Sequence, residues 1–471
     1  MHEDTGAISD AVPGRADVVV IGAGFAGLSA AVRLAAAGRS VVVVEQAPRL
    51  GGRATSFTDR ESGERVDNGQ HAIFGCYRAT YRFLNEIGAA DLVPLQQRFT
   101  LTMADGHARV ATLTCPDWPA PWHLLAGLLR WRAIGLRDRA GALKLARLLL
   151  QVRRLGPRAV ADQVPSDQTV QEWLAMHGQS SALCEWLWNP LAVAALNQSP
   201  ASAAARPFVR VLAEMFAPDP SAAAIGLPTV PLEDLIGPRS VEFLRARGGS
   251  VVLKAPGVVE LDAAGAIRGV WAAERFIETS AVVSSVPWHA IDRIFRGGPP
   301  ASMAAIVRQA LALPSSPIVT VNLWFDGPIP EAAAAPFVGL VGSPMHWVFY
   351  KAAIFGGGAE HVAVVASGAD QLLRQDNDAL SALAADHMAR ALPQLRGRRV
   401  RRSVVIREPR ATFSLAPGLP PRPQTETPIR GLFLAGDWTD TGLPGTIEGA
   451  VLSGHAAADC ALLCWRTSGS E

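Results

Sequence analysis

Lysine and tyrosine are scarce in this chain of 471 residues, which contains only three of each. The 44 basic residues are therefore almost all arginine, and 42 acidic residues reduce the formal net charge to +2. A protein that binds nucleic acid over a broad surface carries a much larger excess of positive charge. The composition argues against that class, and we expect no nucleic-acid partner.

Cysteine and long apolar runs are also rare. The five cysteines form no Cys-x-x-Cys pair and have no histidine at a helpful spacing, so we expect neither a metal site nor a disulfide framework and assume a reducing compartment. No uninterrupted apolar run reaches about 18 residues, so a membrane-spanning helix is not expected. With 49% hydrophobic residues the chain can still form a large core, and its length indicates two or three domains.

The N-terminal segment, residues 1–15, is acidic and precedes the first apolar run. Its charge is wrong for the basic start of a secretory signal, so the apolar run that follows is not interpreted as one. We expect residues 1–15 to be a loose leader.

A nucleotide-binding βαβ pattern follows this leader. A valine-rich strand over 16–21 leads into Gly22-Ala23-Gly24-Phe25-Ala26-Gly27, a helix follows to residue 37, and a second strand over 40–44 ends at Glu45. The glycines permit a tight turn, close approach of a pyrophosphate and close packing of helix on strand, while the acid is placed to bind a ribose diol. The spacing predicts a dinucleotide site.

Two further motifs narrow the cofactor. Arg49-Leu50-Gly51-Gly52-Arg53 comes directly after the ribose acid, and a buried strand near the C-terminus ends in Gly436-Asp437 before a helix that opens at 445–450. Together with the βαβ unit, these pieces resemble the flavin amine oxidase and carotenoid desaturase superfamily. The resemblance implies one bound FAD, with Arg53 on its pyrophosphate and the last helix directed at the flavin.

The same resemblance implies the fold class and the cofactor-binding residues. The fold is α/β, with a discontinuous Rossmann-like FAD-binding domain over 16–75, 226–289 and 406–465 and an inserted α+β substrate domain over 76–225 and 290–405. The cofactor-binding residues implied are Gly22, Gly24, Phe25, Ala26, Gly27, Glu45, Gln46, Gly51, Gly52, Arg53, Gly69, Gln70, His71, Val258, Val259, Gly436, Asp437, Gly445, Thr446 and Ile447.

A narrower resemblance comes from the runs 67–80 and 438–444, supported by 189–197, 208–211, 345–349 and 410–413. These runs resemble the hydroxysqualene dehydroxylases of bacterial hopanoid synthesis. That resemblance implies reduction of hydroxysqualene, an allylic alcohol, to squalene with reduced FAD as hydride donor. Tyr350-Lys351 and Pro409 depart from the family pattern. The alternative on the same fold is a carotenoid or phytoene desaturase; a flavin amine oxidase and an FAD-free prenyl-binding protein fit less well.

Loss of a hydroxyl group requires a proton donor near the flavin. His71 is the first candidate, although a structural hydrogen bond beside the cofactor is its other interpretation. Asp440 and Glu448 are further candidates, and Glu448 could instead tether its helix. His346 and Trp347 are expected to line the substrate tunnel, although tryptophan more often belongs to a core.

Residues 122–158 hold nine basic residues and one acid, and leucines recur there at helical spacing. A basic amphipathic helix with tryptophan suits an anionic membrane surface, whereas an ordinary packed helix with an exposed arginine face is the alternative. We expect a cytoplasmic protein, peripheral on the inner face of the cytoplasmic membrane. Association with the upstream squalene-pathway synthases is a further expectation.

Overall fold

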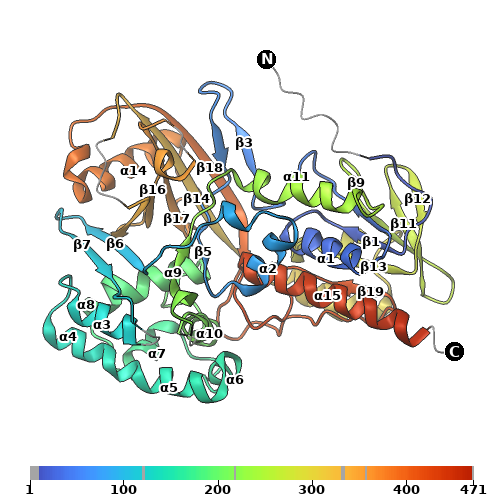
Figure 1. The fold of residues 1–471 in the computed structure, drawn as a ribbon, viewed down its shortest axis with the longest axis horizontal. Coiled ribbons are helices and arrows are strands. Elements are labelled where there is room, and N and C mark those ends of the chain that lie inside the picture. Colours follow the sequence, from blue (N-terminus) through green and yellow to red (C-terminus); the bar gives the residue numbers. More distant parts are fainter. Residues whose placement is uncertain (1–9, 119–121, 217–218, 330–334, 356–357, 469–471) are drawn as a thin grey trace.

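The computed structural model describes residues 10–118, 122–216, 219–329, 335–355 and 358–468. Two large sheets organise the described residues, as Figure 1 shows: a five-stranded sheet with the N-terminal strand in it, and a seven-stranded sheet on the other side of the molecule. The expected combination of a discontinuous Rossmann-like unit with an inserted α+β unit is confirmed.

The five-stranded sheet is parallel and runs in the order β19-β13-β1-β2-β9. Its strands span Leu432–Leu434, Ala281–Ser284, Val18–Ile21, Val41–Val44 and Ser250–Val252. Valine dominates β1 and β2, and every residue of both strands is buried because helices or strands cover both faces of the sheet. Strands from the two ends of the chain therefore lie together.

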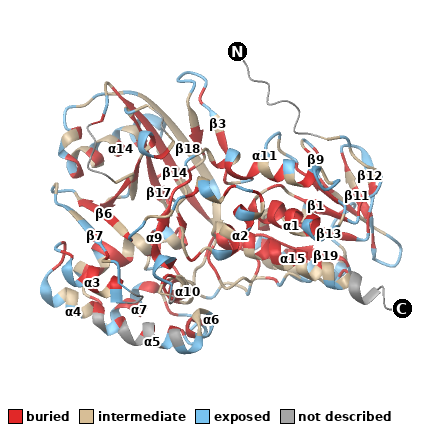
Figure 2. Ribbon diagram, in the orientation of Figure 1, coloured by how far each residue is buried: buried red, intermediate tan, exposed pale blue. Residues whose placement is uncertain are grey.

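Helices α1 (Phe25–Ala36), α11 (Leu232–Arg245) and α15 (Ile447–Ser468) pack on one face of this sheet (Figure 1). The opposite face packs against β10 (Val258–Leu261), β11 (Ile267–Ala272) and β12 (Arg275–Glu278), which form a three-stranded antiparallel sheet. Strands β10 and β11 form an antiparallel hairpin over 258–272. Figure 2 shows α1 and the central strands as almost entirely buried.

The seven-stranded sheet has the order β18-β14-β17-β16-β15-β6-β7. Its strands span Val400–Phe413, Ser315–Phe325, His361–Ser367, Trp347–Tyr350, Phe337–Val341, Thr100–Asp105 and Val110–Thr114. One face packs under α14 (Asn377–Ala391) and forms an apolar core with it. The opposite face belongs to the largest core of the molecule, which it shares with a helical layer.

The helical layer comes from the first insert and lies at one end of that sheet (Figure 1). Its described helices are α3 (Trp122–Arg130), α4 (Leu136–Ala142), α5 (Ala146–Leu155), α6 (Pro157–Asp162), α7 (Val170–Met176), α8 (Ser181–Leu183), α9 (Asn189–Leu196) and α10 (Ala205–Met215). A π-helical turn, Cys184–Trp188, joins α8 to α9.

Packing moves the expected domain boundaries. Helix α2 (Arg78–Glu86) packs on α1 and α15, and α12 (Ala304–Leu311) packs on the β1–β2 face, so both belong to the nucleotide side. Strand β18 continues to Phe413 and belongs to the seven-stranded sheet past residue 405. Elements next to residues 76, 290 and 405 thus pack across the expected boundaries, because motif positions do not report which face of a helix finds a partner.

The described part of the leader is attached rather than loose. The Asp10 carboxylate accepts a hydrogen bond from the Val251 amide at 2.8 Å and pairs with Arg245 at 2.6 Å. This corrects the expectation for residues 10–15, whereas residues 1–9 lie outside the described residues.

Helix α15 is long and apolar enough by length and composition to cross a membrane over Ile447–Cys464. Half of that window is buried inside the molecule, chiefly against α1. Because the core helix of a compact protein meets the same criteria, we interpret α15 as a core helix.

Candidate active site

The glycine turn lies at the end of β1. Gly22 adopts a φ of +104°, which favours glycine, and a Cβ on Gly27 would lie 2.0 Å from the Gly22 carbonyl oxygen. A Cβ on Gly24 would meet only the backbone of Gly51 and Gly52 at 3.8–3.9 Å. Helix α1 begins directly after Gly24 without a side-chain cap, so its first amide groups are available to an anion.

The Arg49–Arg53 loop lies against this turn. The Gly51 amide donates to the Ala23 carbonyl at 2.9 Å, and Gly24 and Gly51 form an isolated parallel bridge. Glycines from both segments therefore lie side by side and form a strip of backbone without side chains. Such a strip fits a pyrophosphate, which needs backbone donors and the absence of side chains.

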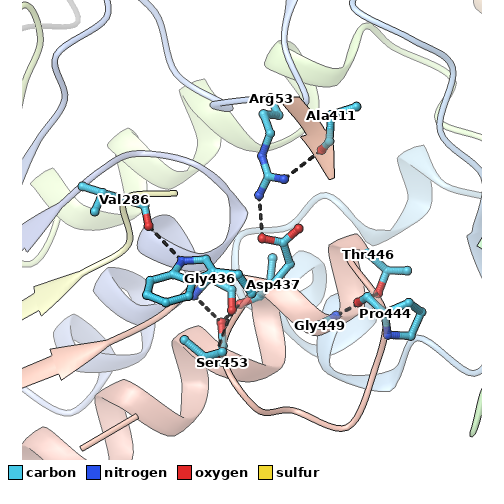
Figure 3. Close-up of polar contacts among 12 residues, drawn as sticks. Arg53, Val286, Ala411, Gly436, Asp437, Pro444, Thr446, Gly449 and Ser453 are labelled. Atoms are coloured by element: carbon cyan, nitrogen blue, oxygen red, sulfur yellow. Dashed lines mark hydrogen bonds and ion pairs between the residues drawn. The ribbon is translucent and has the colours of Figure 1, made fainter. Parts of the chain in front are cut away.

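The C-terminal motif meets this loop through Arg53, as Figure 3 shows. The Arg53 guanidinium donates to the Asp437 carboxylate at 2.6 Å and to the Ala411 carbonyl at 2.8 Å. Asp437 follows Gly436, whose φ is +132°, and its Oδ2 would lie 3.2 Å from a Cβ on Gly445. Three segments far apart in the chain therefore converge, and part of the Arg53 charge is used to hold them together.

Helix α15 begins beside this cluster. The Thr446 hydroxyl accepts a hydrogen bond from the Gly449 amide at 3.1 Å, and Ile447 is the first helical residue (Figure 3). The N-terminus of α15 therefore points toward the convergence of the three segments. Its positive dipole end favours negative charge there.

Glu45 lies at the end of β2, as expected of a ribose acid. Its two carboxylate oxygens accept from the amides of Ala23 and Ala47, both at 2.8 Å, and Gln46 beside it is exposed. Val258 and Val259, two more of the expected cofactor-binding residues, begin β10 next to the ends of β1 and β2, since a Cβ on Gly257 would touch Val44 and Ile21. The residues predicted to contact a dinucleotide from these segments therefore lie at one edge of the sheet.

These residues fit FAD. The glycine strip leaves room for a pyrophosphate, the α1 amides are uncapped, and the Thr55 hydroxyl after Arg53 is buried without a partner among the described residues. Orphaned buried hydroxyls are uncommon in native proteins and point to a missing polar partner. FAD bound here would be held by the amides of 24–27 and of Gly52 and by Glu45, and it would supply hydride chemistry.

The loop that follows β4 (Arg65–Asp67) carries the proposed proton donor. Asn68 donates to the Arg53 carbonyl at 3.2 Å, which ties the loop to the cofactor cradle. The His71 Nδ1 lies 3.1 Å from the Gly69 carbonyl oxygen. Since a carbonyl only accepts, Nδ1 carries the proton, and Nε2 of the neutral ring is an acceptor. Burial lowers the pKa of His71, although Asp67 and the Gly69 carbonyl oppose the shift.

The other two predicted acids have partners of their own. The Glu448 carboxylate accepts from the amides of Ala79 and Thr80, both at 2.9 Å, and from the Thr80 hydroxyl at 2.7 Å. Glu448 therefore caps α2 and joins it to α15, and burial raises the pKa of Glu448. Asp440 accepts from Gln424 at 3.0 Å and lies near Arg422 and Arg158, away from the His71 loop in its contacts.

His346 and Trp347, the two residues predicted to line the substrate tunnel, have different surroundings. The His346 Nδ1 accepts from the Ser367 amide at 3.1 Å, and burial lowers the pKa of His346 to about 4, so this ring is a neutral structural group. Trp347 packs against Phe337 on the sheet face that looks toward the helical layer, and its indole N–H is buried without a partner among the described residues.

Two residues near the His71 loop were not predicted. Thr320, on β14, has a buried hydroxyl that lacks a partner among the described residues and lies 3.7 Å from the position of a Cβ on Gly69. Lys351, the first residue of α13 (Lys351–Phe355), is 1% exposed and binds Gln70. One signal was available: Lys351 is one of only three lysines and departs from the family pattern.

The geometry of the site is that of a flavin-dependent oxidoreductase, and comparison with known proteins gives the same class. A sequence profile described as "Flavin containing amine oxidoreductase" matches residues 25–462. The chain belongs to this flavin-containing amine oxidoreductase family, and its cofactor is FAD.

Sequence relatives and solved structures cover nearly the whole chain. It is 29% identical to a hydroxysqualene dehydroxylase of Rhodopseudomonas palustris, over 95% of this chain and 99% of that protein. It is 27% identical to a 15-cis-phytoene desaturase of Synechococcus elongatus, over 94% of each. The structure of an oxidoreductase from Methanosarcina mazei superposes with a TM-score of 0.71 at 18% identity, covering 94% of this chain and 99% of that one. The structure of a putrescine oxidase bound to putrescine superposes with a TM-score of 0.66 at 17% identity, covering 95% of this chain and 99% of that one.

Proposed function

We propose that this protein reduces hydroxysqualene to squalene. Three curated hydroxysqualene dehydroxylases, at 27–29% identity over nearly their whole length, support this substrate. The observation in the structure that carries the proposal is the contact between the cofactor cradle and an apolar sheet face, through the loop that holds His71. The reaction would break the allylic C–O bond, release water with one added proton and form a new C–H bond, and reduced FAD held by this cradle would supply the hydride.

The apolar sheet face suits a long isoprenoid. Ile318, Trp347 and Phe349 lie on the face of the seven-stranded sheet that packs toward the helical layer, in the core that also holds Leu187 and Leu191. Thr320 shares a strand and a side with Ile318, because side chains alternate along β14. Water is excluded from such a surface, which protects an allylic cation from capture by water.

The state of His71 constrains its role. A neutral ring that donates through Nδ1 to Gly69 offers a lone pair at Nε2, which is suited to accept a proton rather than to give one. If protonated His71 were the acid, turnover would be full below the lowered pKa of His71 and would fall as the pH rises through it. A pH profile that stays flat from 6 to 7.5 would remove His71 as the acid.

The phytoene desaturase relative makes the oxidation of a hydrocarbon, with hydride transfer to the flavin, the second candidate. A desaturase removes hydride from a hydrocarbon and has no hydroxyl to protonate, so a neutral His71 would suit it better than it suits an acid. The two candidates differ in the flavin redox state that each requires.

One anaerobic experiment separates them. The bound flavin is reduced, hydroxysqualene is added in detergent, and flavin reoxidation is followed while the lipid is extracted for mass analysis. We expect the oxidised flavin band to return as squalene forms. If the flavin stays reduced, the dehydroxylase proposal fails, and bleaching of the oxidised enzyme by phytoene or squalene would establish a desaturase.

We further propose that the helical layer rests on an anionic membrane, although not through the face expected from the sequence. The leucines on the apolar face of α5, such as Leu145 and Leu148, are buried in the large core. Among the described residues of this layer, the exposed apolar side chains include Trp122 (60% exposed), Leu129 (45%) and Leu136 (77%). Exposed Arg130, Arg132 and Arg137 alternate with them. This mixture of apolar side chains and arginine complements anionic headgroups.

Sedimentation with vesicles tests this surface. We expect binding to phosphatidylglycerol vesicles to exceed binding to phosphatidylcholine vesicles and to fall at least about fivefold in Leu136→Glu. The matched control is Leu311→Glu, a change at an exposed leucine of the nucleotide side. Equal binding of both variants would refute the proposed surface.

Peripheral location at the inner face of the cytoplasmic membrane and association with the upstream squalene-pathway synthases remain proposals. Membrane fractionation would test the first and co-purification the second.

A further inference from the structure

A buried polar cluster lies behind the cofactor-side loop. The Lys351 Nζ donates to the Gln70 Oε1 at 2.8 Å, lies 3.5 Å from the Asp67 carboxylate and sits 3.7 Å from the centre of the Phe355 ring. The other Asp67 oxygen accepts from Ser56 at 2.6 Å, so the carboxylate is fixed in place. The cluster therefore joins the loop of the nucleotide side to a helix of the substrate side.

The ammonium group of Lys351 determines the orientation of the Gln70 side-chain amide. An ammonium has three donors and no acceptor, so Gln70 must present its oxygen to Lys351. The amide nitrogen then points elsewhere, and it is buried without a partner among the described residues. A buried donor without a partner is costly, which indicates that a group absent from the protein chain itself accepts from it.

The surroundings of Gln70 indicate which group this is. Gln70 lies between Gly69 and His71, and the same loop is tied through Asn68 to Arg53 of the cofactor cradle. The Thr320 hydroxyl, next to Gly69, is a second buried polar group without a partner among the described residues. Two orphaned polar groups from different segments thus flank the point where cofactor and substrate meet.

We propose that Lys351 is a positioning residue that holds the Gln70 amide in one orientation, so that its NH₂ group donates a hydrogen bond to an oxygen at the junction of flavin and substrate. The inference rests on the proposed function. The acceptor oxygen belongs either to a flavin carbonyl or to the substrate hydroxyl, and both present the same chemistry to the amide.

The protonation of Lys351 makes the orientation sensitive to pH. Burial lowers the pKa of Lys351 to about 8, opposed by Asp67 and Glu64. His361, on β17, also faces this group, but burial and Lys351 lower its pKa to about 3, outside the relevant range. Below about pH 8 the ammonium fixes Gln70. Above it the neutral amine also accepts a hydrogen bond, so the amide is free to turn and turnover falls.

Gln70→Glu is the sharpest test, because glutamate keeps the shape and an oxygen for Lys351 but loses the NH₂ donor. We expect Gln70→Glu and Lys351→Met each to keep FAD and to lower kcat per bound flavin at least about tenfold, with KM changed less than twofold. The double variant should be no slower than either single variant. Lys351→Arg should restore turnover and abolish its fall above pH 8. Arg399→Met, which removes an exposed positive charge, is the control.

Two measurements identify the acceptor and guard against misfolding. A shift of the flavin absorption bands in substrate-free Gln70→Glu would assign the acceptor to the flavin, whereas a loss of kcat with unshifted bands would assign it to the substrate hydroxyl. If Lys351→Met does not fold, the double variant Asp67→Asn/Lys351→Met, which removes both buried charges, is used in its place.

Wild-type kcat and unshifted bands in Gln70→Glu would overturn the proposal. A Lys351→Met variant that loses only FAD content, with kcat per bound flavin unchanged, would also overturn it. The spectral measurement needs no substrate, so it separates this failure from failure of the dehydroxylase function.

Discussion

The two large sheets place their functional groups in different ways. The parallel five-stranded sheet is built from small apolar residues, and the groups it offers are backbone amides and glycine turns at its strand ends. The seven-stranded sheet offers side chains on its face: apolar Ile318 and Trp347, with polar Thr320 on the same face. The first arrangement suits a cofactor whose phosphates need close backbone contact, and the second suits a long hydrocarbon with one polar atom.

This contrast indicates where each half tolerates change. A backbone site fails when a side chain is added, whereas a side-chain site fails when one is removed. The four variants below test that difference, in order of decreasing expected effect.

Gly27→Ala should disrupt the nucleotide side most. The added Cβ would lie 2.0 Å from the Gly22 carbonyl oxygen and 2.5 Å from the Ser285 hydroxyl, and the first of these is a backbone atom that cannot turn away as a flexible side chain can. We expect loss of more than about 3 kcal/mol of folding free energy and a protein without bound flavin, measured by absorbance and denaturant unfolding. Gly14→Ala is the control, because a Cβ there meets nothing within 4 Å. Yellow, stable Gly27→Ala protein would contradict the backbone account.

Asn197→Ala should destabilise the substrate side in a corresponding way. Asn197 ends α9 in a left-handed conformation and donates to the Ser316 carbonyl at 2.9 Å and to Thr412 at 3.0 Å, while accepting from the Gly368 amide at 2.7 Å. Losing these buried contacts should cost about 3 kcal/mol in denaturant unfolding. The exposed Asn85→Ala is the control, and equal stability of the two variants would show that the substrate side does not depend on this side chain.

Lys351 joins the two halves, and its stability contribution should depend on pH. Burial lowers the pKa of Lys351 from 10.5 to about 8, so the unfolded chain binds more protons than the folded chain between these values. Folding stability should therefore rise with pH across this range, by about 2 kcal/mol relative to Lys351→Met. Unfolding of the flavin-free proteins at pH 7.5 and 10 measures the difference. Parallel pH curves for the two proteins would rule out a buried titrating lysine.

Arg53→Ala should have the smallest effect of the four, because it weakens one link of the cofactor cradle. The substitution removes the donors to Asp437 and Ala411 and leaves the buried Asp437 carboxylate without this partner. We expect FAD affinity to fall about tenfold, or about 1.4 kcal/mol, by titration calorimetry of the flavin-free protein. Arg60→Ala, at an exposed arginine, should bind FAD as the wild type does. Undiminished affinity in Arg53→Ala would mean that the cradle holds without this link.

Much of the nucleotide side could be predicted because its rules are local. The turn after β1 needs Gly22 at positive φ and Gly27 against the strand, and these requirements are visible in six consecutive residues. The catalytic assignments were harder to make, because they depend on what each side chain meets. Glu448 stands at a motif expected near the flavin, yet its carboxylate is occupied by the amides of α2, 368 and 369 residues away in sequence. Leu148 and Val152 of α5 likewise pack into the large core, which their spacing in the sequence did not indicate.

A dinucleotide site and the backbone that receives it could be predicted from the sequence, because steric rules for glycine, strand and helix act over a few residues, whereas the family and the flavin followed from the resemblance of three motifs to known proteins. Only the tertiary structure decided which polar side chains face one another. Lys351 meets Gln70 across 281 residues, and His71 holds its proton on Nδ1 because of a carbonyl two residues earlier and burial by distant elements. Hydrogen-bond direction, burial and the charge state of a group are properties of its surroundings, and those surroundings form only when the chain has folded.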